Sequence, residues 1–344
     1  MLKTVPFSYE LPRARIAQRP VHPYDAAKLL VIERATGVLH DAVFSELPTY
    51  LHRGDLLLLN NTKVTPARLC GARKHTQGAV ELLLLEQQGE DTWLCLGKPL
   101  KKLKTGEGLS FGHGLCAHVN ERVDEQKVSV TFSVEGGDSS LHERMLEVGM
   151  MPIPPYIRDG QADEQDREDY QTSFAAIEGS VAAPTASLHF TPQLFEALDG
   201  IGVEREMLTL HVGTASFLTL QRQDEDHEYE PPGKERLSVS AALCEKVKDY
   251  RAQGKRIIPV GTTSTRALES ALSGCLDGAT DLFITPGYEF LGVDGLITNF
   301  HQPGTTHLLL VEALLGRELL ERAYRHALEN DYRFLSYGDA MLIL

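Results

Sequence analysis

The chain has 344 residues, of which 42% are hydrophobic, and a formal net charge of −14 at pH 7. A chain of this length can bury a large core and is typical of two domains. The negative charge disfavours non-specific binding of nucleic acid. Five cysteines, at positions 70, 95, 116, 244 and 275, form no C-x-x-C pair, so the sequence signals neither a disulfide framework nor a zinc cluster.

The N-terminus carries polar residues and prolines where a secretory signal would need an unbroken apolar run. The longest apolar runs, such as residues 56–59 and 308–311, are far shorter than the roughly 20 residues that cross a bilayer. We therefore expect a soluble, cytoplasmic protein without a membrane partner.

Residues 28–33 form the first predicted strand. From Gly54 to Gly137 short β-like runs are separated by glycines, which predicts a compact β-barrel or sandwich. These runs are DLLLL, AVELLLLEQ, TWLCLGK, GLSFG, LCAHVNERV and KVSVTFSVEGG.

The pattern then changes to alternating helices and strands. Ser140 and Glu143 match a capping box, which predicts a helix ending near Gly149. Further helices are predicted near 192–199, 240–253, 264–273, 304 and 317, and strands at 203–212, 256–260, 281–286, 293–299 and 338–344. Strands separated by helices favour a largely parallel sheet. The predicted fold is therefore α/β, a mostly parallel sheet with flanking helices (residues 1–58 and 139–344) that carries an inserted small β-barrel (residues 59–138).

The most informative local segment is residues 256–269, RIIPVGTTSTRALE. An apolar strand leads into Gly261 and four hydroxyl residues and then into a helix, so free amides and hydroxyls would converge at a helix N-terminus. Such a turn suits anionic or ribose oxygens. An ordinary helix cap with surplus threonines fits the same pattern. Arg266 and Glu269 could pair on this helix.

Three histidines follow or end predicted strands beside small polar residues: His189, His211 and His301. Histidine suits proton transfer near neutral pH, although each could equally be a hydrogen-bonded structural residue. A metal site is disfavoured because no H-x-x-x-H or H-E-x-x-H spacing occurs. The G-x-S-x-G, G-x-G-x-x-G and G-x-x-x-x-G-K-[ST] motifs are also absent.

Basic residues gather in the predicted barrel. Residues 60–119 hold eight basic and five acidic residues, a net charge of +3. The run at Lys98, Lys101, Lys102 and Lys104 would fit phosphate contacts with a folded RNA. A solvated turn that protects an edge strand is the alternative.

Eight ordered motifs resemble the S-adenosylmethionine:tRNA ribosyltransferase-isomerase family of queuosine biosynthesis. They are NNTKVTPARL (60–69), PPYI (154–157), DYQT (169–172), AAPTASLHF (182–190), TLHVG (209–213), VGTTSTR (260–266), ITNFH (297–301) and YRFLSYGDAMLI (332–343).

The resemblance implies an enzyme that transfers and isomerises the ribosyl group of S-adenosylmethionine onto 7-aminomethyl-7-deazaguanine in tRNA. Adenine and methionine leave, and epoxyqueuosine-tRNA forms. The resemblance also implies a β-barrel set into an α/β domain. S-adenosylmethionine and tRNA would be the partners, with no added cofactor and no metal, since a sulfonium is already a good leaving group.

The resemblance also implies site residues. The proton-handling candidates are His189, His211 and Asp339. The candidate substrate-binding residues are Asn60, Asn61, Thr62, Arg68, Tyr156, Thr185, Thr262, Thr263, Ser264, Arg266, Asn299, His301 and Tyr337. The basic run described above, and not the resemblance, makes Lys98, Lys101, Lys102 and Lys104 the candidate tRNA-binding residues.

The sequence departs from the family pattern at several places. Residues 214–220 read TASFLTL, residues 227–235 lack a His-x-Met-His-x-Glu motif, and residues 24–28 read YDAAK where Arg-Asp-x-Ser-Arg is usual. Ser187 replaces a glycine, and His307 stands where leucine is common. Two other functions therefore stay open: a relative that acts on S-adenosylmethionine without tRNA, and a catalytically silent RNA-binding relative.

Overall fold

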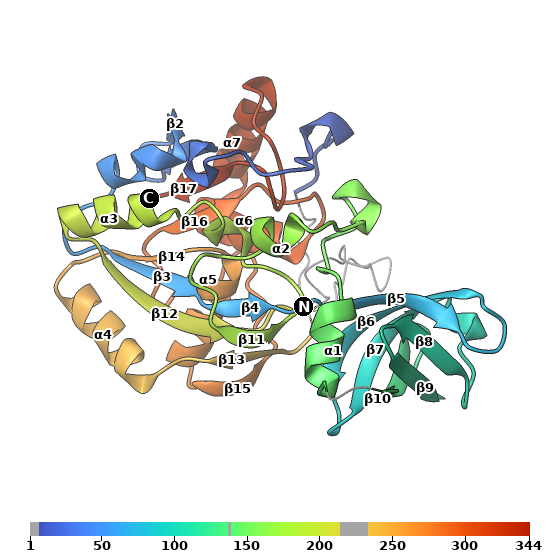
Figure 1. The fold of residues 1–344 in the computed structure, drawn as a ribbon. Helices are drawn as coiled ribbons and strands as arrows, with labels where there is room; N and C mark the ends of the chain where they lie inside the picture. The colour runs from blue at the N-terminus through green and yellow to red at the C-terminus, as the bar shows by residue number, and fades with distance from the viewer. Residues whose placement is uncertain (1–6, 137–138, 214–232) are drawn as a thin grey trace. The chain divides into compact units, whose positions relative to one another are not determined.

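The computed structural model describes residues 7–136, 139–213 and 233–344. The chain divides into two compact units (Figure 1). Unit 1 comprises Met1–Lys63, Tyr156–Arg158 and Asp169–Leu344, and unit 2 comprises Val64–Pro155 and Asp159–Glu168. The departures at residues 214–220, and most of those at 227–235, lie outside the described residues.

A five-stranded sheet in the order β14-β3-β12-β13-β15 forms the centre of unit 1. Its strands are β3 (Leu56–Asn60), β12 (Glu204–Leu210), β13 (Glu235–Ser238), β14 (Ile257–Pro259) and β15 (Asp277–Thr280). β14, β3 and β12 run parallel, and β13 and β15 are antiparallel to their neighbours. The run around β3, expected among the barrel strands, is therefore a central strand here, which explains why all five of its residues are buried.

A second sheet of unit 1 has the order β16-β17-β1-β2. Its strands are β1 (Lys28–Glu33), β2 (Val38–Val43), β16 (Leu296–Asn299) and β17 (Ala340–Ile343). Only β1 and β17 pair in parallel. A small third sheet pairs β4 (Thr62–Val64) with β11 (Ile177–Ser180).

The prediction of a mostly parallel sheet is wrong, because both larger sheets are mixed. A short turn joins β1 to β2, and only antiparallel strands can be joined in that way. Elsewhere, β16 and β17 are separated by two helices and still pair antiparallel, so a helical connection does not fix the relative direction of the strands that it joins. The strand predicted at 281–286 is also wrong: the Leu282 amide donates to the Thr280 hydroxyl (3.1 Å) and the strand ends at Thr280.

The α-helices are α1 (Leu141–Val148), α2 (Asp166–Asp169), α3 (Pro192–Ile201), α4 (Ala241–Ala252), α5 (Thr262–Leu272), α6 (Thr306–Leu315) and α7 (Arg317–Glu329). Short 3₁₀ helices are η1 (Arg13–Arg15), η2 (Tyr24–Ala26), η3 (Phe44–Thr49), η4 (Leu100–Lys102), η5 (Arg158–Gly160) and η6 (Thr185–Ser187). The capping box predicted for α1 is confirmed, since Ser140 and Glu143 bond each other's backbone amides and Gly149 follows the last turn.

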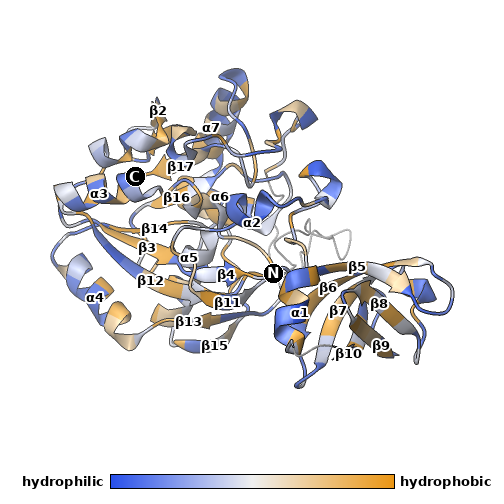
Figure 2. Cartoon of the chain, viewed as in Figure 1, coloured by the Kyte–Doolittle hydropathy of each residue, from blue (hydrophilic) through white to orange (hydrophobic). Residues whose placement is uncertain are grey.

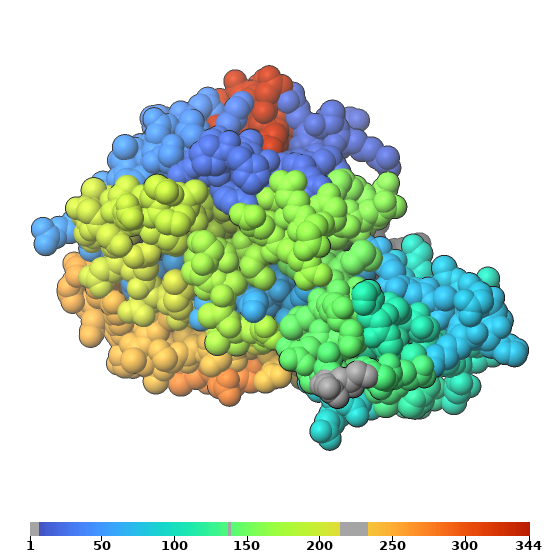
Figure 3. Space-filling model, in the orientation of Figure 1, coloured from blue at the N-terminus to red at the C-terminus, as the bar shows by residue number. Residues whose placement is uncertain are grey.

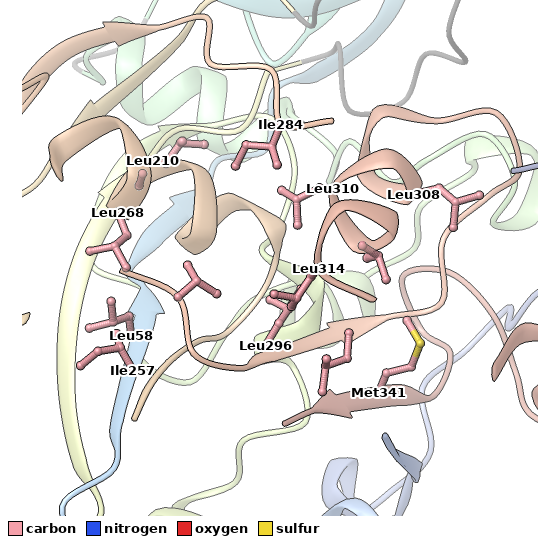
Figure 4. Packing of buried hydrophobic residues seen from close by; sticks show 14 of the residues in the cluster. Leu58, Leu210, Ile257, Leu268, Ile284, Leu296, Leu308, Leu310, Leu314 and Met341 are labelled. Carbon is pink, nitrogen blue, oxygen red and sulfur yellow. The ribbon is translucent and has the colours of Figure 1, made fainter. Parts of the chain in front are cut away.

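The core of unit 1 lies on both faces of the five-stranded sheet. Leu56 and Leu58 pack with α4 and α5, whereas Leu57 and Leu59 pack with α3. This alternation follows from the two-residue period of a strand. Figure 4 shows Leu58, Leu210 and Ile257 of the sheet beside Leu268 of α5, and Figure 2 shows apolar strands beneath helices of mixed polarity. On the face drawn in Figure 3, side chains of α3 lie at the surface of the molecule.

Unit 2 holds a closed six-stranded barrel in the order β10-β7-β6-β5-β8-β9. Its strands are β5 (Arg68–Arg73), β6 (Ala79–Gln87), β7 (Thr92–Lys98), β8 (Gly108–Gly112), β9 (Leu115–Arg122) and β10 (Lys127–Val134). All the barrel pairings are antiparallel. The sequence pattern of short runs broken by glycines thus predicted a barrel correctly.

Among the described residues, no helix is both long enough and apolar enough to cross a membrane.

Candidate active site

Two strand ends and two helix starts meet in unit 1. β14 leads through Val260 and Gly261 into α5, and β16 leads through residues 300–305 into α6. The Gly261 amide donates to the Ile297 carbonyl (2.7 Å), which ties the two segments together. Gly261 has φ 89° and ψ 154°, a conformation that essentially only glycine adopts. The turn therefore depends on this glycine to aim the first amides of α5 at the space between the segments.

A cavity occupies this space, and all of its wall belongs to unit 1. The wall combines hydroxyl, amide and imidazole groups with two tyrosine rings, and no Asp, Glu, Lys or Arg among the described residues lines it. The lining residues are Tyr156, Tyr170, Ala182, Ala183, Pro184, Thr185, Ala186, Val212, Gly261, Thr262, Thr263, Thr298, Asn299, Phe300, His301, Gln302, Thr305, His307, Leu335 and Ser336. Such a wall suits a polar ligand bound by many hydrogen bonds.

His301 and His307 stack on one side of the cavity, with ring centroids 5.3 Å apart and planes 18° apart. His301 shares a 2.8 Å hydrogen bond with the Thr298 hydroxyl, and its amide donates to the Tyr324 hydroxyl (2.9 Å). Burial and then His307 lower the pKa of His301 well below its ordinary value, while burial and then Arg266 lower the pKa of His307 to about 4. Both imidazoles are therefore neutral at pH 7, and each has a ring nitrogen that can accept a hydrogen bond.

Asn299 connects the cavity to two of the proton-handling candidates. Its side-chain oxygen accepts from the Thr185 hydroxyl (2.8 Å), and its nitrogen lies 3.5 Å from Nε2 of His189 and 3.4 Å from the Asp339 carbonyl. Burial is the main cause that lowers the pKa of His189 to about 4. Neither His189 nor Asp339 lines the cavity, so both contact it through Asn299.

Both oxygens of the Asp339 carboxylate accept hydrogen bonds from backbone amides. The carboxylate accepts from the amides of Lys28 (3.0 Å) and Arg333 (2.7 Å), although burial raises its pKa. These two bonds tie the segment before β17 to the start of β1.

His211 lies outside the cavity, although its neighbour Val212 lines it. Its Nδ1 shares a 2.9 Å hydrogen bond with the Thr62 hydroxyl, and burial, followed by Arg236, lowers its pKa. The ring packs against Gly179, where an added Cβ would approach the imidazole to 3.1 Å.

Asn60 and Asn61 form hydrogen bonds with the strands and the helix that build the site. Asn60 is fully buried and bonds both backbone groups of Leu210 (2.9 and 3.0 Å), the Thr62 amide (3.2 Å) and the Thr263 hydroxyl (3.4 Å). Asn61 accepts from the Thr209 hydroxyl (2.7 Å). Both asparagines therefore position strands and helix rather than line the cavity.

The remaining substrate-binding candidates divide by location. Tyr156 lines the cavity and shares a 2.7 Å hydrogen bond with Ser336, and burial is the main cause that raises its pKa to about 12. Ser264 and Tyr337 are buried outside the cavity wall. Arg266 pairs with Glu235, whereas Glu269 accepts from the Leu291 and Gly292 amides, so the expected pairing of Arg266 with Glu269 does not form.

Arg68 and the four lysines belong to unit 2. Arg68 pairs with Glu81 (2.8 Å) and bonds the Gly160 carbonyl. Lys98, Lys101, Lys102 and Lys104 are exposed around η4.

Six of the predicted substrate-binding residues line the cavity: Tyr156, Thr185, Thr262, Thr263, Asn299 and His301. Sequence reasoning missed Tyr170, Gln302, Thr305, His307 and Ser336 as lining residues. Each of these residues lies inside a quoted motif or within a few residues of one, so a position near a motif was the sequence feature that could have predicted it. Among the described residues, no cluster of three or more His, Cys, Asp or Glu could hold a metal ion.

A mixed α/β body with a closed β-barrel carries an uncharged polar cavity between two strand-to-helix turns, and such a cavity is typical of proteins that bind polar small molecules. Comparison with known proteins identifies the family. The model of the queuosine biosynthesis protein family matches residues 4–343. The chain belongs to this family.

Two similar proteins carry the same name. The S-adenosylmethionine:tRNA ribosyltransferase-isomerase of Rhizobium rhizogenes is 45% identical over 357 residues and aligns with 98% of each chain. The protein of the same name from Desulfitobacterium hafniense is 44% identical over 351 residues, covering both chains completely. A crystal structure of S-adenosylmethionine tRNA ribosyltransferase from Thermotoga maritima is 35% identical, covers 98% of this chain and 99% of that one, and has a TM-score of 0.54.

Proposed function

We propose that this protein transfers and isomerises the ribosyl group of S-adenosylmethionine onto 7-aminomethyl-7-deazaguanine in tRNA. Epoxyqueuosine-tRNA forms, and adenine and methionine are released. The observation that carries the proposal is the single cavity that gathers six of the residues implied by the family motifs. Relatives with the corresponding name, which align with almost the whole chain, support it.

The cavity has groups suited to the nucleoside and to the sulfonium of S-adenosylmethionine. The first amides of α5 and the hydroxyls of Thr262 and Thr263 can bind ribose or base oxygen and nitrogen atoms. The rings of Tyr156 and Tyr170 can stabilise a sulfonium cation through their faces. The neutral imidazoles of His301 and His307 can exchange hydrogen bonds with polar atoms of the ligand.

The sulfonium is a good leaving group, so the protein mainly has to orient two substrates and move protons. We propose S-adenosylmethionine as co-substrate, without a further cofactor or a metal. Thr185 and Asn299 orient the ligand, and His189 and Asp339 hold Asn299 in place. His211 fixes Thr62 beside the site.

The tRNA would bind the barrel domain, predicted from the sequence as residues 59–138 between the two parts of the α/β domain. Lys98, Lys101, Lys102 and Lys104 are exposed and make no ion pair with the described residues, whereas Lys74 and Lys127 pair with Glu135 and Asp124. Unpaired lysines can neutralise phosphates without first breaking an ion pair. We place the reaction in the cytoplasm, where tRNA and S-adenosylmethionine both occur.

An adenine-release assay tests the proposed function. The purified protein is incubated with S-adenosylmethionine and with tRNA that carries the aminomethyl base, with unmodified tRNA, or without tRNA. Release only with the modified tRNA supports the proposal. Release without tRNA supports a relative that acts on S-adenosylmethionine alone, and tRNA binding without release under any condition supports a catalytically silent RNA-binding relative.

Measuring tRNA affinity at several salt concentrations tests whether the surface formed by Lys98, Lys101, Lys102 and Lys104 binds tRNA. Replacing Lys101, Lys102 and Lys104 with glutamine should weaken binding and lower the salt slope by about 1 for each lysine that neutralises a phosphate. The control replaces the paired Lys74 and Lys127 with glutamine and should change the slope less. Equal slopes for the two variants would reject this surface as the tRNA-binding surface.

A further inference from the structure

A second, smaller pocket adjoins the cavity, because Thr262 and His307 line both spaces. Its other walls are Arg266, Leu282, Phe283, Ile284, Thr306 and Leu310. It is thus a recess that combines apolar side chains with two threonines, a histidine and one guanidinium group, and it lies at the starts of α5 and α6.

Arg266 lines this recess, and one nitrogen of its guanidinium group has no hydrogen-bond partner among the described residues. Its Nη1 pairs with Glu235, and its Nε donates to the Leu282 carbonyl (3.0 Å). Its Nη2 is buried and makes no hydrogen bond with the described residues. The side chain is only 12% exposed, so water reaches it poorly. Buried donors are almost always paired, and an unpaired one points to a missing partner.

Glu235 leaves the remaining guanidinium edge free. One of its carboxylate oxygens accepts from Arg266, and the other accepts from the Gly213 amide (2.9 Å). Glu235 does not line the recess. Nη2 is therefore the Arg266 nitrogen that an incoming carboxylate could bind without displacing Glu235.

The other groups facing the recess also favour an anion. Thr262 is the first residue of α5 and Thr306 the first of α6, so two positive helix ends lie at its wall. His307 is the remaining titratable group there and carries no negative charge. The apolar side chains of Leu282, Ile284 and Leu310 exclude water and strengthen a charge-assisted hydrogen bond.

We infer that this recess binds the carboxylate of the amino-acid portion of S-adenosylmethionine, with Nη2 of Arg266 as its donor, while the nucleoside occupies the adjoining cavity. The inference rests on the proposed function and deepens it. It makes Arg266 a residue that distinguishes ligands by their carboxylate.

Isothermal titration calorimetry with two ligands tests the assignment. S-adenosylmethionine is compared with its decarboxylated analogue, which keeps the sulfonium, the nucleoside and the ammonium group. The wild-type protein should bind S-adenosylmethionine on the order of 10- to 100-fold more tightly, because the analogue cannot form the hydrogen bond between charged groups. In Arg266→Gln the two affinities should agree within about threefold.

A matched control is Arg256→Gln. Arg256 also pairs with a buried carboxylate, that of Asp55, but it lines neither space. This variant should keep the wild-type preference between the two ligands even if it loses stability. If Arg266→Gln does not fold, Arg266→Lys replaces it, and the preference should fall several-fold because lysine has no second donor edge.

The outcomes separate the two proposals. Equal binding of both ligands by the wild-type protein, or an unchanged preference in the Arg266 variants, would overturn the carboxylate assignment alone. Failure of the wild-type protein to bind either ligand would instead overturn the proposed function.

Discussion

Asn60 offers the sharpest test of how the fold builds the site. Replacing it with alanine removes hydrogen bonds to both backbone groups of Leu210, to the Thr62 amide and to the Thr263 hydroxyl. Three backbone groups are then left without this partner at a position with no solvent exposure. At about 1–3 kcal/mol for each unsatisfied group, and with some relaxation, the free energy of unfolding should fall by about 3–6 kcal/mol.

For a chain of 344 residues this decrease corresponds to a drop in Tm of about 4–8 °C. Differential scanning calorimetry measures the shift, and calorimetric titration of S-adenosylmethionine measures the effect on the site. Asn61→Ala is the control, since the Asn61 side chain bonds the Thr209 hydroxyl and its removal should cost only about 1 kcal/mol. Equal decreases for the two variants would refute the reasoning that Asn60 joins β12, β4 and α5.

Three further predictions concern pH, a loop and a turn. Burial lowers the pKa of His189 to about 4, so at mildly acid pH the unfolded chain binds a proton that the folded chain does not. The free energy of unfolding should therefore fall as the pH drops from about 6.5 to 4, with a contribution from this residue of roughly 2 kcal/mol at pH 5. Equal free energies from urea unfolding at pH 7.5 and pH 5 would contradict this. Glu269→Gln should cost about 2–4 kcal/mol in urea unfolding, because one oxygen that accepts from the backbone or Tyr288 becomes a donor; a decrease under 1 kcal/mol would argue against it. Gly261→Ala should strain the turn before α5 by about 1–3 kcal/mol and weaken S-adenosylmethionine binding, and unchanged affinity in calorimetry would count against the role of this turn.

The sequence predicted the local elements of the fold better than their pairing. The capping box at Ser140 and the glycine turn at Gly261 are fixed by residues a few positions apart, so both were readable. Strand direction was not, because β16 and β17 are separated by two helices and pair antiparallel through residues distant in the chain. The apolar residues around Leu282 also favoured the prediction of a strand, although β15 ends at Thr280.

The candidate site shows the same limit. Thr262, Thr263, Asn299 and His301 lie in two motifs that the parallel bridge between Val260 and Ile297 brings together. Asp339 and His211 also lie in quoted motifs, yet the Asp339 carboxylate accepts from two backbone amides, and His211 bonds Thr62 and does not line the cavity. A motif indicates that a residue matters; whether it contacts a ligand or supports another residue depends on tertiary packing.

The central claim is that the cavity between the starts of α5 and α6 binds a sulfonium nucleoside. A crystal structure of the protein with S-adenosylmethionine tests it most directly. We expect the adenosyl group against Thr262, Asn299 and His301, with the carboxylate reaching Arg266. A nucleoside bound at another place in the molecule would contradict the account.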